Sequence, residues 1–209
     1  MPTPMFPLQS ALLPGETLPL RIFEPRYCRL VADCLDAAEP VFGVVLITRG
    51  REVGGGDARG DVGVMARITD CVQVGAQYRL LAAIGGRIRV RQWLDDDPYP
   101  RAVVVPWPDE AGPPVGPERI GDVIDAVTGL YQQVADARGG RLRPDALAVD
   151  AKTAGDPGRH IYALAARVPI GQADRYALLA APTLAQRVDT LLDAIETVAA
   201  MVRFQLSDE

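Results

Sequence analysis

The stretch FPLQSALLPGETLPLRIFEPRY, from Phe6 to Tyr27, carries the strongest information about the fold. Two short apolar runs flank Pro14-Gly15, which is typical of two strands joined by a turn. The second run ends at Pro25, whose ring lacks an amide hydrogen but fixes the φ that suits the first position of a helix. Beyond it, apolar residues recur at helical spacing: Tyr27, Leu30, Val31, Cys34 and Leu35. The sequence therefore predicts strand, turn, strand and then a helix that begins at Pro25.

This stretch resembles the amino-terminal substrate-binding domain of the Lon family of ATP-dependent proteases. The resemblance rests on PG-x-x-LPL-x-IFEPRY, which specifies eleven positions between Pro14 and Tyr27. Further matches follow at Phe42–Val45, Gly63–Ile68, Gly85–Val90, Tyr99–Ala102, Leu164–Pro169 and Leu178–Leu192. Nearly all of the 209 residues are covered, and the family implies a β-rich, PUA-like lobe followed by a helical lobe.

The bulk composition is that of an ordinary globular protein, with 48% hydrophobic and 23% charged residues. The net charge of −5 argues against a nucleic-acid partner, because binding to phosphates needs clustered cations. The first ten residues contain no basic region followed by an apolar core, and no run reaches the roughly 18 apolar residues that span a bilayer. We therefore expect a soluble cytoplasmic protein with no membrane partner.

The first half of the chain has the pattern of strands. Pro40–Thr48 is a continuous apolar run, as in a strand that is covered on both faces. Arg49–Asp61 is rich in glycine and charge, which favours a mobile loop between strands. Gly85-Gly86 is a predicted tight turn. The other strands are expected at Val62–Val74, Gln77–Ile84, Arg87–Leu94 and Tyr99–Trp107.

The segment Pro106–Pro117 marks the boundary between two parts of the chain. It holds five prolines and two glycines, so it can form neither a regular helix nor a central strand. We interpret it as a semi-rigid linker between a β-rich lobe over residues 1–110 and a helical lobe over residues 111–209. The expected fold class is α+β, with a PUA-like pseudo-barrel followed by a helical bundle.

Apolar stripes predict four helices in the second lobe, enough for a small bundle. The first helix covers Glu118–Ala137, and Gly139-Gly140 ends it. The others are expected between Pro157 and Pro169, over Gly171–Ala180, and from a Thr183–Gln186 capping box onward.

Catalytic motifs are missing from this sequence. A phosphate loop has the pattern GxxxxGK[ST], but the single lysine, Lys152, has no such glycines before it, and Gly54–Gly56 has no lysine after it. A Ser-Lys protease dyad needs a serine in a reactive setting, and neither Ser10 nor Ser207 lies in a nucleophile elbow. Full-length Lon proteases resemble a fusion of this domain to an ATPase and a Ser-Lys protease. We therefore expect a stand-alone form without catalysis or a cofactor.

Metal-binding patterns are weak as well. Cys28, Cys34, Cys71 and His160 could supply a zinc ion with ligands, but their spacing matches no zinc motif. We expect three buried reduced thiols and a partly buried histidine that packs against its neighbours. Asp95–Asp97 is interpreted as a solvated turn rather than a cation site.

The corner from Phe23 to Tyr27 allows two interpretations. In the structural one, Phe23 and Tyr27 pack in the core, Glu24 caps the helix and Arg26 forms an ion pair. In the functional one, the corner lines a groove that receives an extended polypeptide through backbone pairing and apolar pockets. The candidate binding residues are then Arg21, Phe23, Glu24, Arg26 and Tyr27, with the loop Val53–Gly60 beside them.

The resemblance implies a non-catalytic protein that binds exposed or unfolded segments of other proteins. Such a protein would act as an adaptor or regulator of proteolysis, together with a separate protease.

Two other functions remain open at this point. PUA domains bind RNA, and four arginines could form a local basic patch: Arg87, Arg89, Arg91 and Arg101. A small-molecule sensor is the other alternative, because a Lon-type lobe also occurs in ubiquitin-ligase adaptors that bind small ligands. Their tri-tryptophan pocket is absent here, since the chain contains only Trp93 and Trp107.

Overall fold

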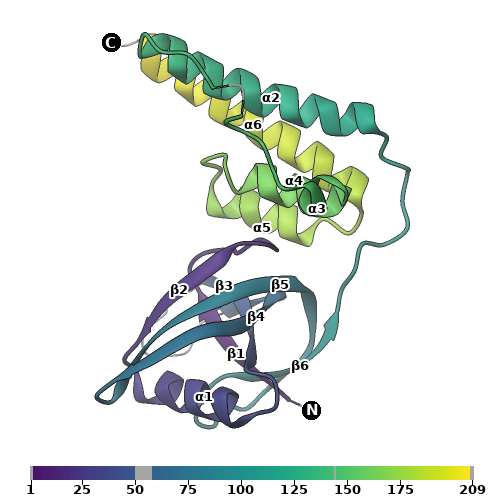
Figure 1. The fold of residues 1–209 in the computed structure, drawn as a ribbon. Helices are drawn as coiled ribbons and strands as arrows, with labels where there is room; N and C mark the ends of the chain where they lie inside the picture. The colour runs from purple at the N-terminus through teal and green to yellow at the C-terminus, as the bar shows by residue number, and fades with distance from the viewer. Residues whose placement is uncertain (1, 50–57, 144, 208–209) are drawn as a thin grey trace. The chain divides into compact units, whose positions relative to one another are not determined.

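The opening predicted for Phe6–Tyr27 is confirmed, because two strands separated by a turn lead into a helix. The computed structural model describes residues 2–49, 58–143 and 145–207. The chain divides into two compact units, Met1–Pro108 and Asp109–Glu209, named here the β unit and the helical unit. Among the described residues, six strands and one helix belong to the first unit and five helices to the second (Figure 1). The fold is therefore mixed α+β.

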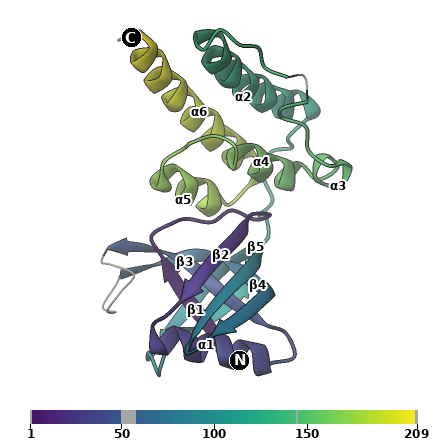
Figure 2. The same ribbon diagram turned by 60° about the vertical axis from the view of Figure 1, so that its left-hand side comes forward.

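One sheet organises the β unit. Its strands are β1 (Thr3–Leu8), β2 (Thr17–Ile22), β3 (Val41–Arg49), β4 (Ala58–Val74), β5 (Gln77–Leu94) and β6 (Arg101–Pro106). The strand order is β2-β5-β4-β3-β1-β6, and β6 also pairs with β5. Strands β5, β4, β3, β1 and β6 thus close into a ring, while β2 pairs with β5 alone among the described strands (Figure 2). Met5, Val45, Ile88 and Ala102 form part of the buried core.

Helix α1 (Pro25–Asp36) follows β2 and begins at Pro25, as predicted. Its Tyr27 ring stacks on Phe6 of β1 with 4.2 Å between the ring centroids. Asp33 of the same helix accepts a hydrogen bond of 2.8 Å from the Tyr99 hydroxyl. These contacts attach α1 to the sheet. The prediction of a strand covered on both faces is also confirmed, since Phe42–Val45 of β3 are all buried.

The prediction of a tight turn at Gly85-Gly86 is wrong, because β5 runs through both glycines. Val64 pairs with Arg87 and Ala66 with Ile84, so the two glycines lie opposite a single residue of β4. This is a β-bulge, which bends a strand and often contains glycine. The predicted loop Arg49–Asp61 lies partly outside the described residues, at 50–57. Residues 58–61 already belong to β4.

The helical unit contains α2 (Pro117–Ala137), α3 (Ala151–Ala154), α4 (Pro157–Ala165), α5 (Gln172–Ala180) and α6 (Leu184–Ser207). The predicted end of the first helix is confirmed, with Gly139 at a φ of +67°. Thr183 caps α6 as predicted, since its hydroxyl oxygen accepts a bond from the Gln186 amide at 3.2 Å. Residues 107–116 form neither helix nor strand.

A buried ion pair joins the start of the helical unit to α6. Arg187 is only 1% exposed, and both of its terminal nitrogens donate to the Asp109 carboxylate. Its guanidinium also lies 4.3 Å from the centroid of the Tyr162 ring of α4. Because an unpaired charge is costly inside a protein, Asp109 is part of the structure of this unit.

Candidate functional site

The solvent-facing side of β2, β5 and β4, named here the outer face, contains one of the predicted site residues, Arg21. Side chains alternate between the two sides of a strand, and along β2 the residues Leu18 and Ile22 are buried while Thr17, Pro19 and Arg21 are exposed. The neighbouring strands continue the exposed face. On these two strands the outer face consists of Arg79, Leu81 and Ala83 of β5 and of Arg67, Asp70, Val72 and Val74 of β4.

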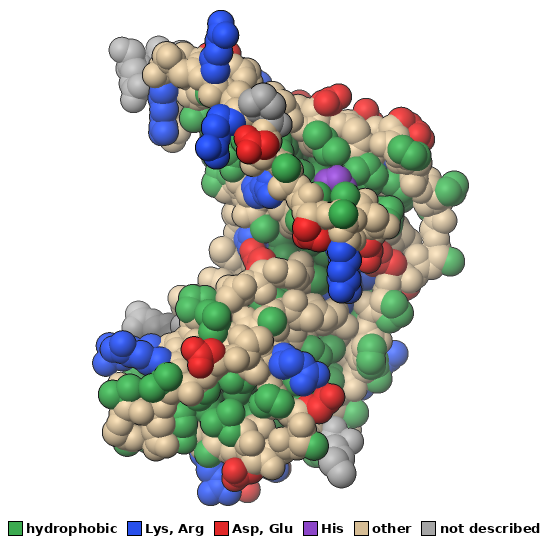
Figure 3. Space-filling view, viewed as in Figure 1, with side chains coloured by type: hydrophobic (Ala, Val, Ile, Leu, Met, Phe, Trp, Pro, Cys, Tyr) green, Lys and Arg blue, Asp and Glu red, His purple; other side chains and the backbone are tan. Residues whose placement is uncertain are grey.

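Large apolar side chains are exposed on and beside this face. Phe23, directly after β2, is 57% exposed, and Val72 and Val74 are each 55% exposed. Figure 3 shows hydrophobic and arginine side chains together on the surface of the β unit. Sequence reasoning missed the valines, although the alternation in Asp70–Val74 was a usable signal. It missed them because their exposure depends on which strands cover them.

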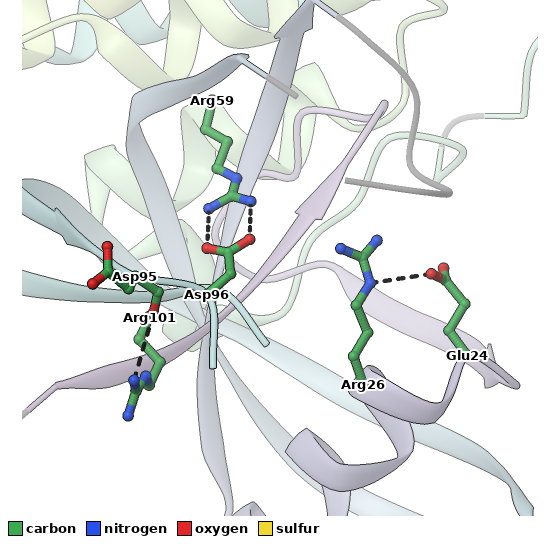
Figure 4. Close-up of polar contacts among 6 residues, drawn as sticks. All are labelled: Glu24, Arg26, Arg59, Asp95, Asp96 and Arg101. Carbon is green, nitrogen blue, oxygen red and sulfur yellow. Dashed lines mark hydrogen bonds and ion pairs between the residues drawn. The ribbon is translucent and has the colours of Figure 1, made fainter. Parts of the chain in front are cut away.

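The corner after β2 corrects the structural interpretation at two positions. Phe23 does not pack in the core, since it is exposed. Glu24 occupies the N-cap position, but within the described part of the chain its side chain bonds to no amide of the helix. Its carboxylate instead accepts a bond of 3.1 Å from Arg26 Nε (Figure 4).

The same corner confirms the structural interpretation at two other positions. Arg26 forms the expected ion pair with Glu24, and its guanidinium lies 4.5 Å from the centroid of the Tyr27 ring. Tyr27 is 4% exposed. The structure thus leaves Arg21 and Phe23 accessible to a partner, whereas Tyr27 is buried beneath the corner.

The backbone of β2 offers an edge to a partner. The Ile84 amide donates to the Glu16 carbonyl at 2.9 Å, so the even-numbered residues direct their backbone groups toward β5. The backbone groups of the odd-numbered residues Thr17, Pro19 and Arg21 point away from β5. On that side of β2, no strand of the described ranges pairs with it. Proline suits such a position because it has no amide hydrogen to donate. An added strand would find donors at Thr17 and Arg21 and carbonyl acceptors at all three.

Three of the four arginines considered for RNA binding have other contacts. Arg87 is 6% exposed, and its guanidinium lies 4.3 Å from the Trp107 ring centroid. Arg89 stacks on the same ring at 3.9 Å. Arg101 donates to the backbone carbonyl of Asp95 (Figure 4). The buried guanidinium of Arg87 is therefore poorly placed to contact a phosphate chain.

The second tryptophan, Trp93, is half-buried and also lies beside an arginine. The Arg59 guanidinium lies 4.9 Å from the Trp93 ring centroid and donates two bonds to Asp96, of 2.9 and 2.6 Å (Figure 4). Asp96 is thus held in an ion pair at the turn after β5.

The thiols and the histidine fit structural roles. Cys34 is buried as expected, but Cys28 and Cys71 are only half-buried, which corrects the prediction of three buried thiols. Burial, assisted by Asp33, raises the pKa of Cys34 to about 12. Burial also lowers the pKa of His160, with a further contribution from Arg167. No metal-binding cluster of acidic, cysteine and histidine side chains occurs among the described residues.

The residues considered for catalysis lie in different parts of the molecule. Ser10 lies just after β1, in the β unit. Lys152 lies in α3 of the helical unit, and the side chain of Ser207 lies outside the described part. None of the helices in the described ranges combines the length and the apolar run needed to cross a bilayer.

Comparisons with known proteins agree on one family. The family model described as "ATP-dependent protease La (LON) substrate-binding domain" matches residues 2–197. A crystal structure of a Lon N-terminal domain protein from Xanthomonas campestris is 26% identical, with a TM-score of 0.67 over 92% of this chain and 98% of that one. The N-terminal domain of a Mycobacterium avium complex Lon protease has the same fold, with a TM-score of 0.63 at 14% identity over 94% of this chain and 98% of that one. No curated protein matches the chain.

Proposed function

Since the chain belongs to the substrate-binding domain family of the ATP-dependent protease La (LON), we propose that it binds exposed or unfolded segments of other proteins through the outer face and the β2 edge. The β unit is then the substrate-binding lobe. The ring of five strands supports the PUA-like description of this lobe. We call the protein whose segment is bound the client. The proposed role requires no covalent bond to be made or broken in the client.

The observation that carries the proposal is the exposed Phe23 beside an open strand edge. Burying a side chain of this size contributes about 1.5–3 kcal/mol. Unfolded segments expose apolar side chains that folded clients bury, and a patch of this kind selects for them. Backbone pairing along β2 adds affinity that depends little on the client sequence.

Pro19 limits how strongly this edge can pair. It interrupts the row of outward amides, as prolines on edge strands commonly do. A client would therefore bind by a short pairing supported by side-chain contacts. Weak, reversible capture suits an adaptor that delivers clients to a separate protease in the cytoplasm, or a regulator that competes for them.

Binding of an unfolded protein to matched variants tests the proposal. Fluorescein-labelled casein is titrated with the parent, Phe23→Ala and Leu35→Ala, with the anisotropy as the readout. Leu35 is the control because it is an exposed apolar residue on α1. We expect Phe23→Ala to weaken binding about tenfold and Leu35→Ala to leave it unchanged. Equal affinity for all three proteins would place the client elsewhere.

A further inference from the structure

Two arginines face each other on the outer face without a compensating acid. Arg21 of β2 and Arg79 of β5 are direct cross-strand partners. Arg21 donates to the Gln77 side chain at 3.3 Å, and among the described residues neither arginine has a carboxylate partner. Like charges directly opposite one another destabilise a sheet. The pair is therefore a local centre of positive charge in a protein whose net charge is −5.

Two other arginines of the β unit do have acidic partners. Arg67, on the same face, pairs with Glu39 at 3.2 Å, and Arg59 pairs with Asp96. Asp70 lies on the outer face opposite Leu81, but it makes no ion pair with Arg79 in the described part of the chain. The positive charge of Arg21 and Arg79 is thus available to an incoming group.

Apolar residues lie on both sides of this pair. Arg79 also pairs with Val72, and Phe23 and Val74 lie toward one end of the face. Toward the other end, Pro19 pairs with Leu81. Alternate residues of a strand are about 6.6 Å apart. An extended segment that lies along β2 would therefore meet three surfaces in turn. The first is apolar, the second carries the positive charge of the two arginines, and the third is again apolar.

We propose that this surface selects client segments in which an acidic residue has apolar residues two positions before and two positions after it. This inference rests on the proposed function and specifies its client. The carboxylate accepts hydrogen bonds from Arg21 and Arg79, and the flanking side chains cover Phe23 on one side and Pro19 with Leu81 on the other. A peptide fits better than a nucleic acid because the apolar surface alternates with the charge at the period of a β-strand.

Three labelled peptides of equal length test the inference by anisotropy at low salt. The first has the core Leu-Thr-Glu-Thr-Val, the second replaces Glu by Gln, and the third has the composition of the first with Glu at one end. Each is titrated with the parent, Arg79→Gln and Arg91→Gln. Arg91 is the control because it is an exposed arginine of β5 beyond the segment that pairs with β4. Circular dichroism first establishes that both variants are folded.

The parent and Arg91→Gln should prefer the first peptide over the other two by about fivefold, the upper range for an exposed ion pair. In Arg79→Gln the preference should fall to less than twofold. Equal binding of all three peptides to the parent, or an unchanged preference in Arg79→Gln, overturns the inference alone. Failure of the parent to bind both the peptides and casein overturns the proposed function with it. Displacement of the first peptide by an equimolar RNA oligonucleotide also overturns the inference.

Discussion

Phe23 and Tyr27 are aromatic residues at the two ends of one corner, and their surroundings give them different roles. Tyr27 lies on the buried side of α1 and stacks on Phe6, so its ring contributes to the stability of the β unit. Phe23 follows the last residue of β2 and is exposed. It is therefore available for binding. The Arg26–Glu24 ion pair joins the two ends of the corner.

Truncation of the two aromatic residues should separate stability from binding. We expect Tyr27→Ala to lower the free energy of unfolding by about 3 kcal/mol, as is typical of a buried aromatic residue. Phe23→Ala should change it by less than about 0.5 kcal/mol, as for an exposed site. Urea unfolding followed by tryptophan fluorescence measures both values, because Trp93 and Trp107 lie in the β unit. Similar losses in the two variants would contradict the assignment of roles.

The single histidine gives a clear pH test. Burial lowers the pKa of His160 below its ordinary value of 6.5, so the unfolded chain binds a proton at a higher pH than the folded chain. Stability of the helical unit should therefore fall as the pH drops through 6.5. Once the pH is below the pKa that His160 has in the folded protein, the stability should fall no further on this account. His160→Gln should lose this part of the pH dependence. An imidazole proton resonance that titrates at or above 6.5 in the folded protein would contradict this.

Some side-chain environments could be predicted from the sequence and others could not. The burial of Tyr27 follows from helical spacing, which is a local property. The exposure of Phe23 does not, because it depends on β2 lying at the edge of the sheet. The cross-strand meeting of Arg21 and Arg79 depends on register, which no local pattern of this sequence specifies.

At the level of elements, helix starts were the most predictable feature. Pro25 acts through its own backbone and Thr183 through a neighbour within one turn, and a helix begins beside each of them. The error at Gly85-Gly86 has a physical reason. A glycine pair is compatible with a turn and with a bulge, and the long pairing of β4 with β5 selects the bulge.

The edge strand β2 supports a prediction of its own. Pro19→Thr restores an amide donor on the open edge, and β-branched residues favour strands. We expect this variant to self-associate more than the parent, with a concentration-dependent rise in the mass measured by light scattering. Pro2→Thr is the control because Pro2 precedes β1 and is exposed. If Pro19→Thr has the same mass as the parent at every concentration, the edge is not open in solution.

In the molecule as a whole, the two units contain different functional side chains. The β unit contains the outer face, both tryptophans and all three cysteines, whereas the helical unit contains His160 and the buried Arg187–Asp109 pair. The predicted boundary after residue 110 would separate Asp109 from Arg187, so the ion pair argues for a boundary before Asp109. The proline-rich composition predicted a linker, but it carried no information about this long-range pair.

Hydrogen exchange in the presence of an unfolded client shows which part of the chain binds it. Amide exchange of the full chain is measured by mass spectrometry with and without saturating casein. We expect slower exchange over residues 17–23 and 77–83, because a client would pair with the open edge and cover the outer face. Exchange over α6 should stay unchanged. Protection confined to the helical unit, with no change over residues 17–23, would contradict the account.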